Sequence, residues 1–193
     1  MLVNTKNDSD KPRADSVLNK KRVLEVAVVL FNKRGIETTL EEIAKEAHVG
    51  IGTVYRHFPT KHALFESVIR VTMLELIETA QFLRTAKDPG TALLEFMLHM
   101  AHSAKLKHSL VDALALTEET ASSHLQDVIQ TFDTNFIHLV ANAQKAGAIR
   151  TDLTATDIRT LLAGCVLASK RSQITDISTL IQIVYKGIST SDG

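Results

Sequence analysis

The stretch TLEEIAKEAHVGIGTVYRHFPTKHAL, residues 39–64, decides the fold of this chain. It opens with Thr39 and Glu42 at the spacing of a capping box, in which the threonine hydroxyl accepts a hydrogen bond from the backbone amide of residue 42 and the glutamate reaches back. A short helix is therefore expected to start here. Its inner face carries Ile43, Ala44 and Ala47.

A second short helix is expected after a tight turn at residues 48–50, and it runs to about His57. Two short helices joined by such a turn form a helix-turn-helix, whose second helix lies in the major groove of DNA. Ala44 is small enough for two helices to cross at it, and Val54 and Phe58 can anchor the second helix to a core. The residues that project outward are Gly52, Thr53, Tyr55, Arg56 and His57. A helical hairpin with no DNA role is the alternative interpretation.

Further helices are predicted on both sides of this pair. The first runs from about residue 16 to residue 34 and ends at Gly35, which can adopt the left-handed conformation that closes many helices. Its apolar residues at helical spacing are Val17, Leu24, Ala27, Val28 and Phe31. A long helix over about residues 60–84 follows the pair. It carries Leu64, Phe65, Val68, Val71 and Leu74.

The rest of the chain predicts five more helices. Asp88 and Pro89 indicate a cap followed by proline in the first turn. Gly147 ends a helix, and the span from Thr154 to Asp157 indicates another cap. The expected ranges are about 89–102, 108–116, 123–146, 155–170 and 176–188. Together with the four helices before them, they predict an all-α protein of about nine helices.

Composition and charge limit the possible functions. The 193 residues are 45% hydrophobic, which is enough to bury a core, and their formal net charge is zero. The charge is uneven, because residues 1–70 carry 12 Lys and Arg against 9 Asp and Glu, whereas residues 71–193 carry 10 against 13. A slightly basic N-terminal part fits phosphate contact at that end. We expect a disordered tail (1–14), a helix-turn-helix domain (15–66) and a helical domain (67–193).

The compartment expected for the protein is the cytoplasm. Cys165 is the single cysteine, so no disulfide can form within the chain, and a reducing environment is the simpler interpretation. No apolar run reaches the roughly 20 residues of a membrane span. Residues 1–16 also lack the apolar segment of a secretory signal. No association with a membrane is expected.

The quoted stretch resembles the DNA-binding signature of the TetR family of transcriptional regulators almost position by position, most specifically from Gly50 to Lys61. The resemblance implies an N-terminal three-helix DNA-binding head and a C-terminal helical domain that binds a ligand and forms a homodimer through its last two helices. Two positions depart from the family pattern: serine often stands where this chain has Gly50, and glycine where it has His48. Glycine is an acceptable N-cap, so neither departure threatens the fold.

The resemblance also implies which residues contact DNA. Positions that commonly touch the DNA backbone in the family are occupied here by Thr39, Gly52, Thr53, Tyr55, His57 and Lys61. Ile51 and Arg56 lie where base contacts are expected. An arginine there can donate two hydrogen bonds to guanine. A solvated cation on the helix surface is the alternative for Arg56.

The C-terminal half holds two apolar groups. The first either lines a ligand cavity or forms packed core, and its members are Phe82, Phe96, Met97, Met100, Leu116, Phe132 and Phe136. The second lies on the last two helices, where a run that is apolar on nearly every side must be covered on nearly every side. We expect it to form a dimer interface, with monomer core as the alternative. Its members are Leu161, Leu162, Cys165, Val166, Ile177, Leu180, Ile181 and Val184.

No cofactor, metal or catalytic group is expected. His99 and His102 share a helix, with His108 and His138 elsewhere, but no acidic or thiol partner is spaced with them to hold a metal. Cys165 lies in an apolar helix and is expected to be a structural thiol rather than a reactive one. The sequence has no glycine-rich phosphate loop and no nucleophile elbow, so an enzyme is disfavoured.

Of three function classes, the favoured one is a ligand-responsive repressor. It would be a homodimer whose two recognition helices lie about 34–36 Å apart on a palindromic operator of double-stranded DNA. A small molecule of unknown identity would release it. The alternative is a DNA-binding accessory or architectural protein whose C-terminal domain only dimerises or docks a protein partner. An enzyme is the least supported class.

Overall fold

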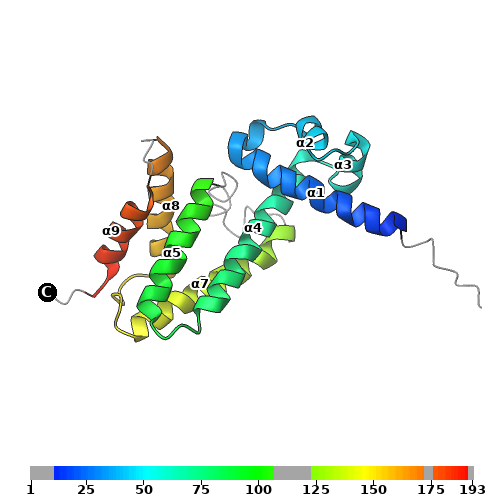
Figure 1. The fold of residues 1–193 in the computed structure, drawn as a ribbon. Coiled ribbons are helices and arrows are strands. Elements are labelled where there is room, and N and C mark those ends of the chain that lie inside the picture. Colours follow the sequence, from blue (N-terminus) through cyan, green and yellow to red (C-terminus); the bar gives the residue numbers. More distant parts are fainter. Residues whose placement is uncertain (1–10, 107–122, 172–175, 191–193) are drawn as a thin grey trace, which may run out of the picture. The chain divides into compact units, whose positions relative to one another are not determined.

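The computed structural model describes residues 11–106, 123–171 and 176–190 (Figure 1). These residues form eight α-helices and one short 3₁₀ helix, and the β pairing among them is an isolated bridge between Ile149 and Ser189. The elements are α1 (Lys11–Arg34), η1 (Gly35–Glu37), α2 (Leu40–Glu46), α3 (Ile51–His57), α4 (Lys61–Leu83), α5 (Pro89–Leu106), α7 (Ser123–Lys145), α8 (Ala155–Arg171) and α9 (Ser178–Ile188). The all-α prediction is confirmed. The helix expected over residues 108–116 lies outside the described residues.

Helix α1 is longer than the sequence analysis predicts. It begins at Lys11 instead of about residue 16, so residues 11–14, expected to belong to a disordered tail, are helical. Lysine, arginine and alanine are good helix formers, and the polar composition of this segment hides that propensity. Val17, expected on the inner face, is exposed because the buried hydrophobic face of α1 begins only at Val23. Residues 1–10 of the expected tail lie outside the described residues.

The predicted helix ends are confirmed at their caps. Gly35 and Gly147 have φ values of +62° and +71°, in the left-handed region that favours glycine. The Asp88 carboxylate accepts hydrogen bonds from two backbone amides of the first turn of α5, at 3.0 and 3.3 Å. Before α8, the Thr154 amide donates to the Asp157 carboxylate at 2.8 Å, and the Asp157 amide donates to the Thr154 hydroxyl oxygen at 3.1 Å.

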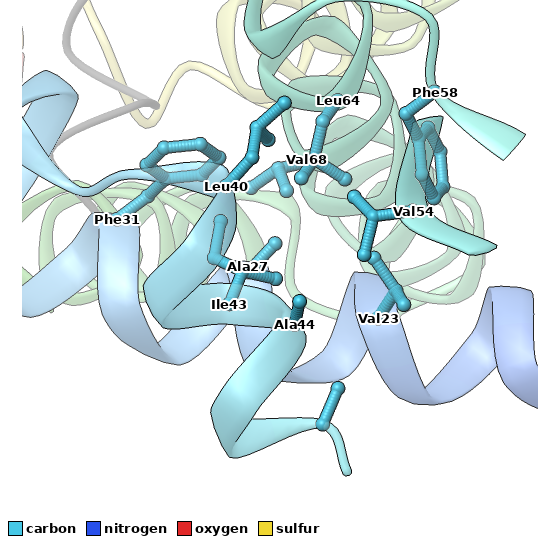
Figure 2. Packing of buried hydrophobic residues seen from close by; sticks show 11 residues of the cluster. Val23, Ala27, Phe31, Leu40, Ile43, Ala44, Val54, Phe58, Leu64 and Val68 are labelled. Atoms are coloured by element: carbon cyan, nitrogen blue, oxygen red, sulfur yellow. The ribbon is translucent and has the colours of Figure 1, made fainter. Parts of the chain in front are cut away.

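The chain divides into two compact units, residues 1–68 and 69–193. In the N-terminal unit, α1 to α4 surround an apolar core (Figure 2). The Phe31 ring packs edge-to-face on Phe65, with the ring centroids 5.4 Å apart. Figure 2 shows Val54 close to Val23, so that α3 is joined to α1 through this core. The core consists of Val23, Ala27, Phe31, Leu40, Ile43, Ala44, Ala47, Val54, Phe58, Leu64 and Val68.

In the C-terminal unit, α5 packs against α7, α8 and α9. The ring of Phe96 on α5 lies 6.3 Å from that of Phe132 and 5.8 Å from that of Phe136, both on α7, measured between centroids. The end of α9 is joined to the loop before α8 by the β-bridge, in which the Arg150 amide donates to the Ile188 carbonyl at 2.9 Å. The C-terminal unit therefore has a hydrophobic core of its own, and the bridge ties its last helix to the rest of the unit.

The turn between α2 and α3 contains one strained residue. His48 has a φ of +54°, the only positive φ of a non-glycine residue among those described. Its amide donates to the Lys45 carbonyl at 3.2 Å, and the Val49 amide donates to the Ala44 carbonyl at 3.0 Å. The left-handed conformation disfavours any residue with a Cβ. The departure from the TetR pattern at His48 therefore places a histidine where glycine would fit better.

Replacing His48 with glycine is expected to stabilise the protein. Glycine removes the penalty of about 1–2 kcal/mol that a Cβ causes in the left-handed conformation. The greater conformational freedom of glycine in the unfolded chain lowers the stability by about 0.5–1 kcal/mol. The free energy of unfolding, measured by urea denaturation, should therefore rise by about 0.5–1 kcal/mol. His48→Ala keeps the Cβ and is the matched control. An equal gain in both variants would contradict strain at this turn.

Candidate nucleic-acid interface

Helix α2 is held at its start by the predicted capping box. The Thr39 amide donates to the Glu42 carboxylate at 2.9 Å, and the Glu42 amide donates to the Thr39 hydroxyl oxygen at 3.2 Å. The hydrogen bond from the Thr39 backbone, and then the charge of Arg34 at 2.9 Å, lower the pKa of Glu42. The Thr39 hydroxyl also donates to Glu42 at 3.4 Å. Thr39 thus serves first as a cap, and any contact with DNA competes with Glu42.

Helix α3 has little side-chain bulk in its first turn. Gly50 is its N-cap, and the Thr53 amide donates to the Gly50 carbonyl at 2.8 Å. A Cβ added to Gly52 would meet no atom within 4 Å, so packing does not require glycine there. The bare backbone instead lets another molecule approach α3 closely.

The sides of α3 differ in character. Val54, and Phe58 just after the helix, are buried in the core shown in Figure 2. The remaining sides carry the residues for which the sequence predicts DNA contacts: Ile51, Gly52, Tyr55 and Arg56, which are exposed, and Thr53 and His57, which are half-buried. The structure thus brings these six residues together on one short helix, on the sides that the core leaves uncovered.

Basic groups gather where α3 ends and α4 begins. Burial, and then the positive charges of Arg56 and Lys20, lower the pKa of His57. Lys61 is half-buried in the first turn of α4, and the Thr60 hydroxyl caps that turn by accepting a backbone amide at 3.0 Å. The family pattern in the sequence marks His57 and Lys61 but not Lys20, because α1 is distant from α3 along the chain.

The residues considered for a ligand cavity lie in different surroundings. Five of them are buried in the core of the C-terminal unit: Phe96, Met97, Met100, Phe132 and Phe136. Phe82, near the end of α4, is 78% exposed and does not join them. Leu116 lies outside the described residues.

Thr72 is a residue of interest that the sequence analysis misses. It lies on α4 in the C-terminal unit, is 1% exposed, and its hydroxyl has no hydrogen-bond partner. Two other buried polar side chains described in this unit are satisfied, since the Ser169 hydroxyl donates to the Val166 carbonyl at 2.9 Å and Asn135 bonds to Arg84 and Thr131. A threonine in an apolar helix gives no sign in the sequence that its hydroxyl is unpaired.

The residues expected at a dimer interface separate into two sets. Leu162, Val166, Ile177 and Ile181 are buried within the single chain, where α5 packs against α8 and α9. The other set is Leu161, which is exposed, and Cys165, Leu180 and Val184, which are half-buried. For the first set, the alternative of monomer core describes the single chain better.

Two exposed apolar residues join the second set, and the sequence analysis misses both. They are Leu167 of α8, 50% exposed, and Ile183 of α9, 60% exposed. Leu161 lies three residues before Gly164 and Leu167 three residues after it, so these positions together span about 120° around α8. This spacing is the one sign in the sequence that Leu167 belongs with Leu161. Burial raises the pKa of the Cys165 thiol, which agrees with a structural rather than a reactive cysteine.

Known proteins match both units of the chain. The model for bacterial regulatory proteins of the tetR family matches residues 23–68, and that for the C-terminal domain of SbtR-like transcriptional regulators matches residues 88–190. A stretch of 59 residues is 42% identical to the HTH-type transcriptional regulator SAB2452 of Staphylococcus aureus (strain bovine RF122 / ET3-1). That match covers 30% of this chain and about a third of the relative, 32% of its length.

Solved structures share the fold over nearly the whole chain. A TetR transcription regulatory protein from Mycobacterium vanbaalenii is 35% identical, with a TM-score of 0.64 over 93% of this chain and 99% of that one. The TetR transcriptional regulator SCO0520 from Streptomyces coelicolor is 32% identical, with a TM-score of 0.65 over 89% of this chain and 99% of that one. No helix of the described residues is long and apolar enough to cross a membrane. The chain belongs to the TetR family of transcriptional regulators and carries their DNA-binding helix-turn-helix.

Proposed function

We propose that this regulator is a homodimeric repressor that binds a palindromic operator through α3 and leaves it when a small molecule binds the C-terminal unit. The observation that carries the proposal is the surface of α3. Most of its exposed residues are polar or small, whereas its opposite side is anchored in the core by Val54. A helix of this kind fits the major groove, where side chains reach both base edges and phosphates. Operator binding, dimerisation and ligand response rest on different parts of the chain.

Arg56 and Ile51 are proposed to contact bases. The exposed guanidinium of Arg56 can donate two hydrogen bonds to guanine, and Ile51 can contact the methyl group of thymine. Gly52 lets the backbone of α3 approach the groove. Thr53 and Tyr55 carry hydroxyls that can donate to phosphate oxygens, which fix the register of the helix on DNA.

The remaining proposed contacts lie at helix ends and would bind the phosphate backbone of DNA. They are Thr39, His57 and Lys61. Lys61 is the strongest of them, because its charge adds to the positive end of the 23-residue helix α4. Thr39 would have to share its hydroxyl with Glu42. The Nε2 atom of His57 is buried and has no hydrogen-bond partner, so the ring would have to turn outward for this nitrogen to reach a phosphate.

Separate replacements of Lys61 and Arg56 are expected to have different effects: the first lowers the affinity for any DNA, and the second lowers the preference for the operator sequence. Lys61→Ala should weaken binding to all duplexes and make the log–log salt dependence shallower by about one unit. Arg56→Ala should mainly reduce the preference for the operator over mutated duplexes, by about 1–3 kcal/mol at one base pair. Both are measured by fluorescence anisotropy with duplexes from the promoter region of the protein's own gene.

Lys87→Ala is the matched control for this pair. Lys87 is an exposed lysine outside the N-terminal unit, so its loss changes the net charge equally and leaves the sequence of the helix-turn-helix unchanged. If Lys61→Ala behaved like Lys87→Ala, and Arg56→Ala left base preference unchanged, the proposed docking face would be wrong.

Exposed apolar side chains on α8 and α9, two helices that pack against each other, support dimerisation. Leu161 and Leu167 lie on α8, and Ile183 lies on α9. A Cβ added to Gly164 or Gly187 would meet no atom within 4 Å, so the surface beside these side chains is open. A second copy can cover such a face by presenting the same face, which produces a two-fold axis. A two-fold protein suits a palindromic operator.

Placing arginine on this face is expected to separate the protomers. Leu167→Arg and Ile183→Arg should each raise the dissociation constant of the dimer about a hundredfold or more, because an unpaired charge would be buried at the interface. The measurement is sedimentation equilibrium, with circular dichroism to show that the helices remain. Leu74→Arg, at an exposed leucine of α4, is the control and should stay dimeric. Dissociation of the control alone would place the interface on another face.

Thr72 supports a ligand site in the C-terminal unit. Its hydroxyl is buried without a partner, on a helix whose neighbouring Met73 and Leu76 are also buried. An unsatisfied buried hydroxyl costs about 1–3 kcal/mol. A mostly apolar ligand with one hydrogen-bonding group would satisfy it. The core of the C-terminal unit also holds Phe96, Met97 and Met100, and a ligand pocket is usually lined by such apolar side chains.

Thr72→Val is expected to stabilise the free protein by about 1 kcal/mol, because it removes an unpaired hydroxyl at nearly constant volume. Operator affinity without ligand should not change. Small apolar compounds that release the labelled operator should weaken its binding roughly 5–150-fold in the wild type, and much less in Thr72→Val. Thr79→Val is the control, since the Thr79 hydroxyl donates to the Glu75 carbonyl at 3.0 Å. Equal responses in both variants would exclude Thr72 from the site, and no release by any compound would favour a ligand-independent accessory protein.

A further inference from the structure

A carboxylate lies beside the Thr39 hydroxyl, which is one of the proposed contacts to DNA. The Thr39 hydroxyl donates to Glu42 Oε2 at 3.4 Å, and Thr39 is exposed, so a phosphate from outside the protein can reach it. A phosphate oxygen that accepts this hydroxyl would lie within roughly 6 Å of the Glu42 carboxylate, since a hydroxyl donates over about 2.7 Å. Two anions at this distance repel each other.

The Glu42 carboxylate stays in place when the Thr39 hydroxyl turns to DNA. The Thr39 amide donates to the same carboxylate oxygen at 2.9 Å, and this hydrogen bond belongs to the capping box that starts α2. The hydroxyl bond, at 3.4 Å, is longer than the usual range of about 2.5–3.0 Å, so its hydrogen is readily redirected to a phosphate. The hydroxyl oxygen can meanwhile keep accepting the Glu42 amide. A negative charge therefore remains next to the proposed contact.

Arg34, the last residue of α1, binds the other oxygen of this carboxylate. Its guanidinium donates to Glu42 Oε1 at 2.9 Å, whereas the Thr39 amide donates to Oε2. The ion pair is exposed to solvent, and such pairs add little to the stability of a fold. Its other effects are local: the carboxylate is held at both oxygens, and a positive charge offsets the negative one.

We propose that Arg34 is a positioning residue for the DNA contact of Thr39. It acts through Glu42, because it fixes the carboxylate and offsets the charge that would otherwise repel a phosphate at the Thr39 hydroxyl. The inference rests on the proposed docking of the helix-turn-helix on DNA. The family resemblance does not mark Arg34 as a DNA contact, and in this role Arg34 does not touch the phosphate.

Two other roles for Arg34 predict different results. If its guanidinium bound a phosphate directly, its loss would weaken binding whether or not Glu42 were charged. If the ion pair only stabilised the start of α2, loss of either partner would weaken binding alike. Glu42→Gln separates these roles, because a capping box tolerates glutamine, which carries no charge.

The experiment titrates a labelled operator duplex with the full chain at low salt, followed by fluorescence anisotropy. Arg34→Ala should weaken binding about 3–10-fold, because the carboxylate charge is then no longer offset. Arg34→Lys keeps the charge and should weaken binding less. Glu42→Gln should bind more tightly than the wild type. In the Glu42→Gln background, Arg34→Ala should lose most of its effect, which is the sign that the two residues act on one contact.

Lys33→Ala and Glu41→Gln are the matched controls. Lys33 is an exposed cation in the same last turn of α1, and Glu41 is an exposed acid in the same first turn of α2. Each control changes the net charge as much as the corresponding test variant and leaves the pair of Arg34 and Glu42 intact. Lys33→Ala should weaken binding less than Arg34→Ala, and Glu41→Gln should not rescue Arg34→Ala.

The outcomes separate this inference from the proposed function. If the wild type bound no duplex, the proposed function would fail, and this inference with it. If the wild type bound, the inference alone would be overturned by any of three results: Arg34→Ala no weaker than Lys33→Ala, an equal loss in the Glu42→Gln background, or a Glu42→Gln variant as weak as Arg34→Ala. Thermal melting followed by circular dichroism shows that each variant is folded at the temperature of the titration.

Discussion

Helix α3 is seven residues long, and a helix of that length does not persist in water, because nucleation costs more than so few hydrogen bonds return. Its existence depends on the burial of Val54 and Phe58 against α1, α2 and α4. Ala44 contributes by being small and buried in the same core. The side chains of α3 that we propose to contact DNA take their direction from this contact.

The same contact explains why the chemistry gathers at the two ends of α3. At one end, the chain must turn sharply from α2, and His48 adopts a left-handed conformation to do so. At the other end, Phe58 must enter the core, which draws His57 partly inward and leaves its Nε2 without a partner. Unsatisfied or strained groups in a stable fold concentrate at functional sites. Of the other two unpartnered buried atoms described, Thr72 Oγ1 lies in the C-terminal unit, whereas nothing in the structure explains Asn32 Oδ1.

Local features of the fold could be predicted from the sequence, because they depend on neighbours along the chain. The capping box of Thr39 and the glycine ends at Gly35 and Gly147 are of this kind. Features that depend on tertiary packing could not. Leu161 and Leu162 are adjacent and equally apolar, yet one is exposed and the other is buried under packed helices. The left-handed His48 and the approach of Lys20 to Phe58 likewise have no local signature.

The neutral charge of the whole chain has a consequence for how the head can hold DNA. Without a net positive field, long-range attraction to DNA is weak, and affinity must come from a few placed donors. One head with few phosphate contacts binds weakly. Two heads linked in a dimer gain from their high effective concentration, which multiplies modest affinities without new contacts. The proposed dimer surface of α8 and α9 is therefore as much a part of the DNA-binding proposal as α3, since a dimer would supply the affinity that the charge of the chain does not.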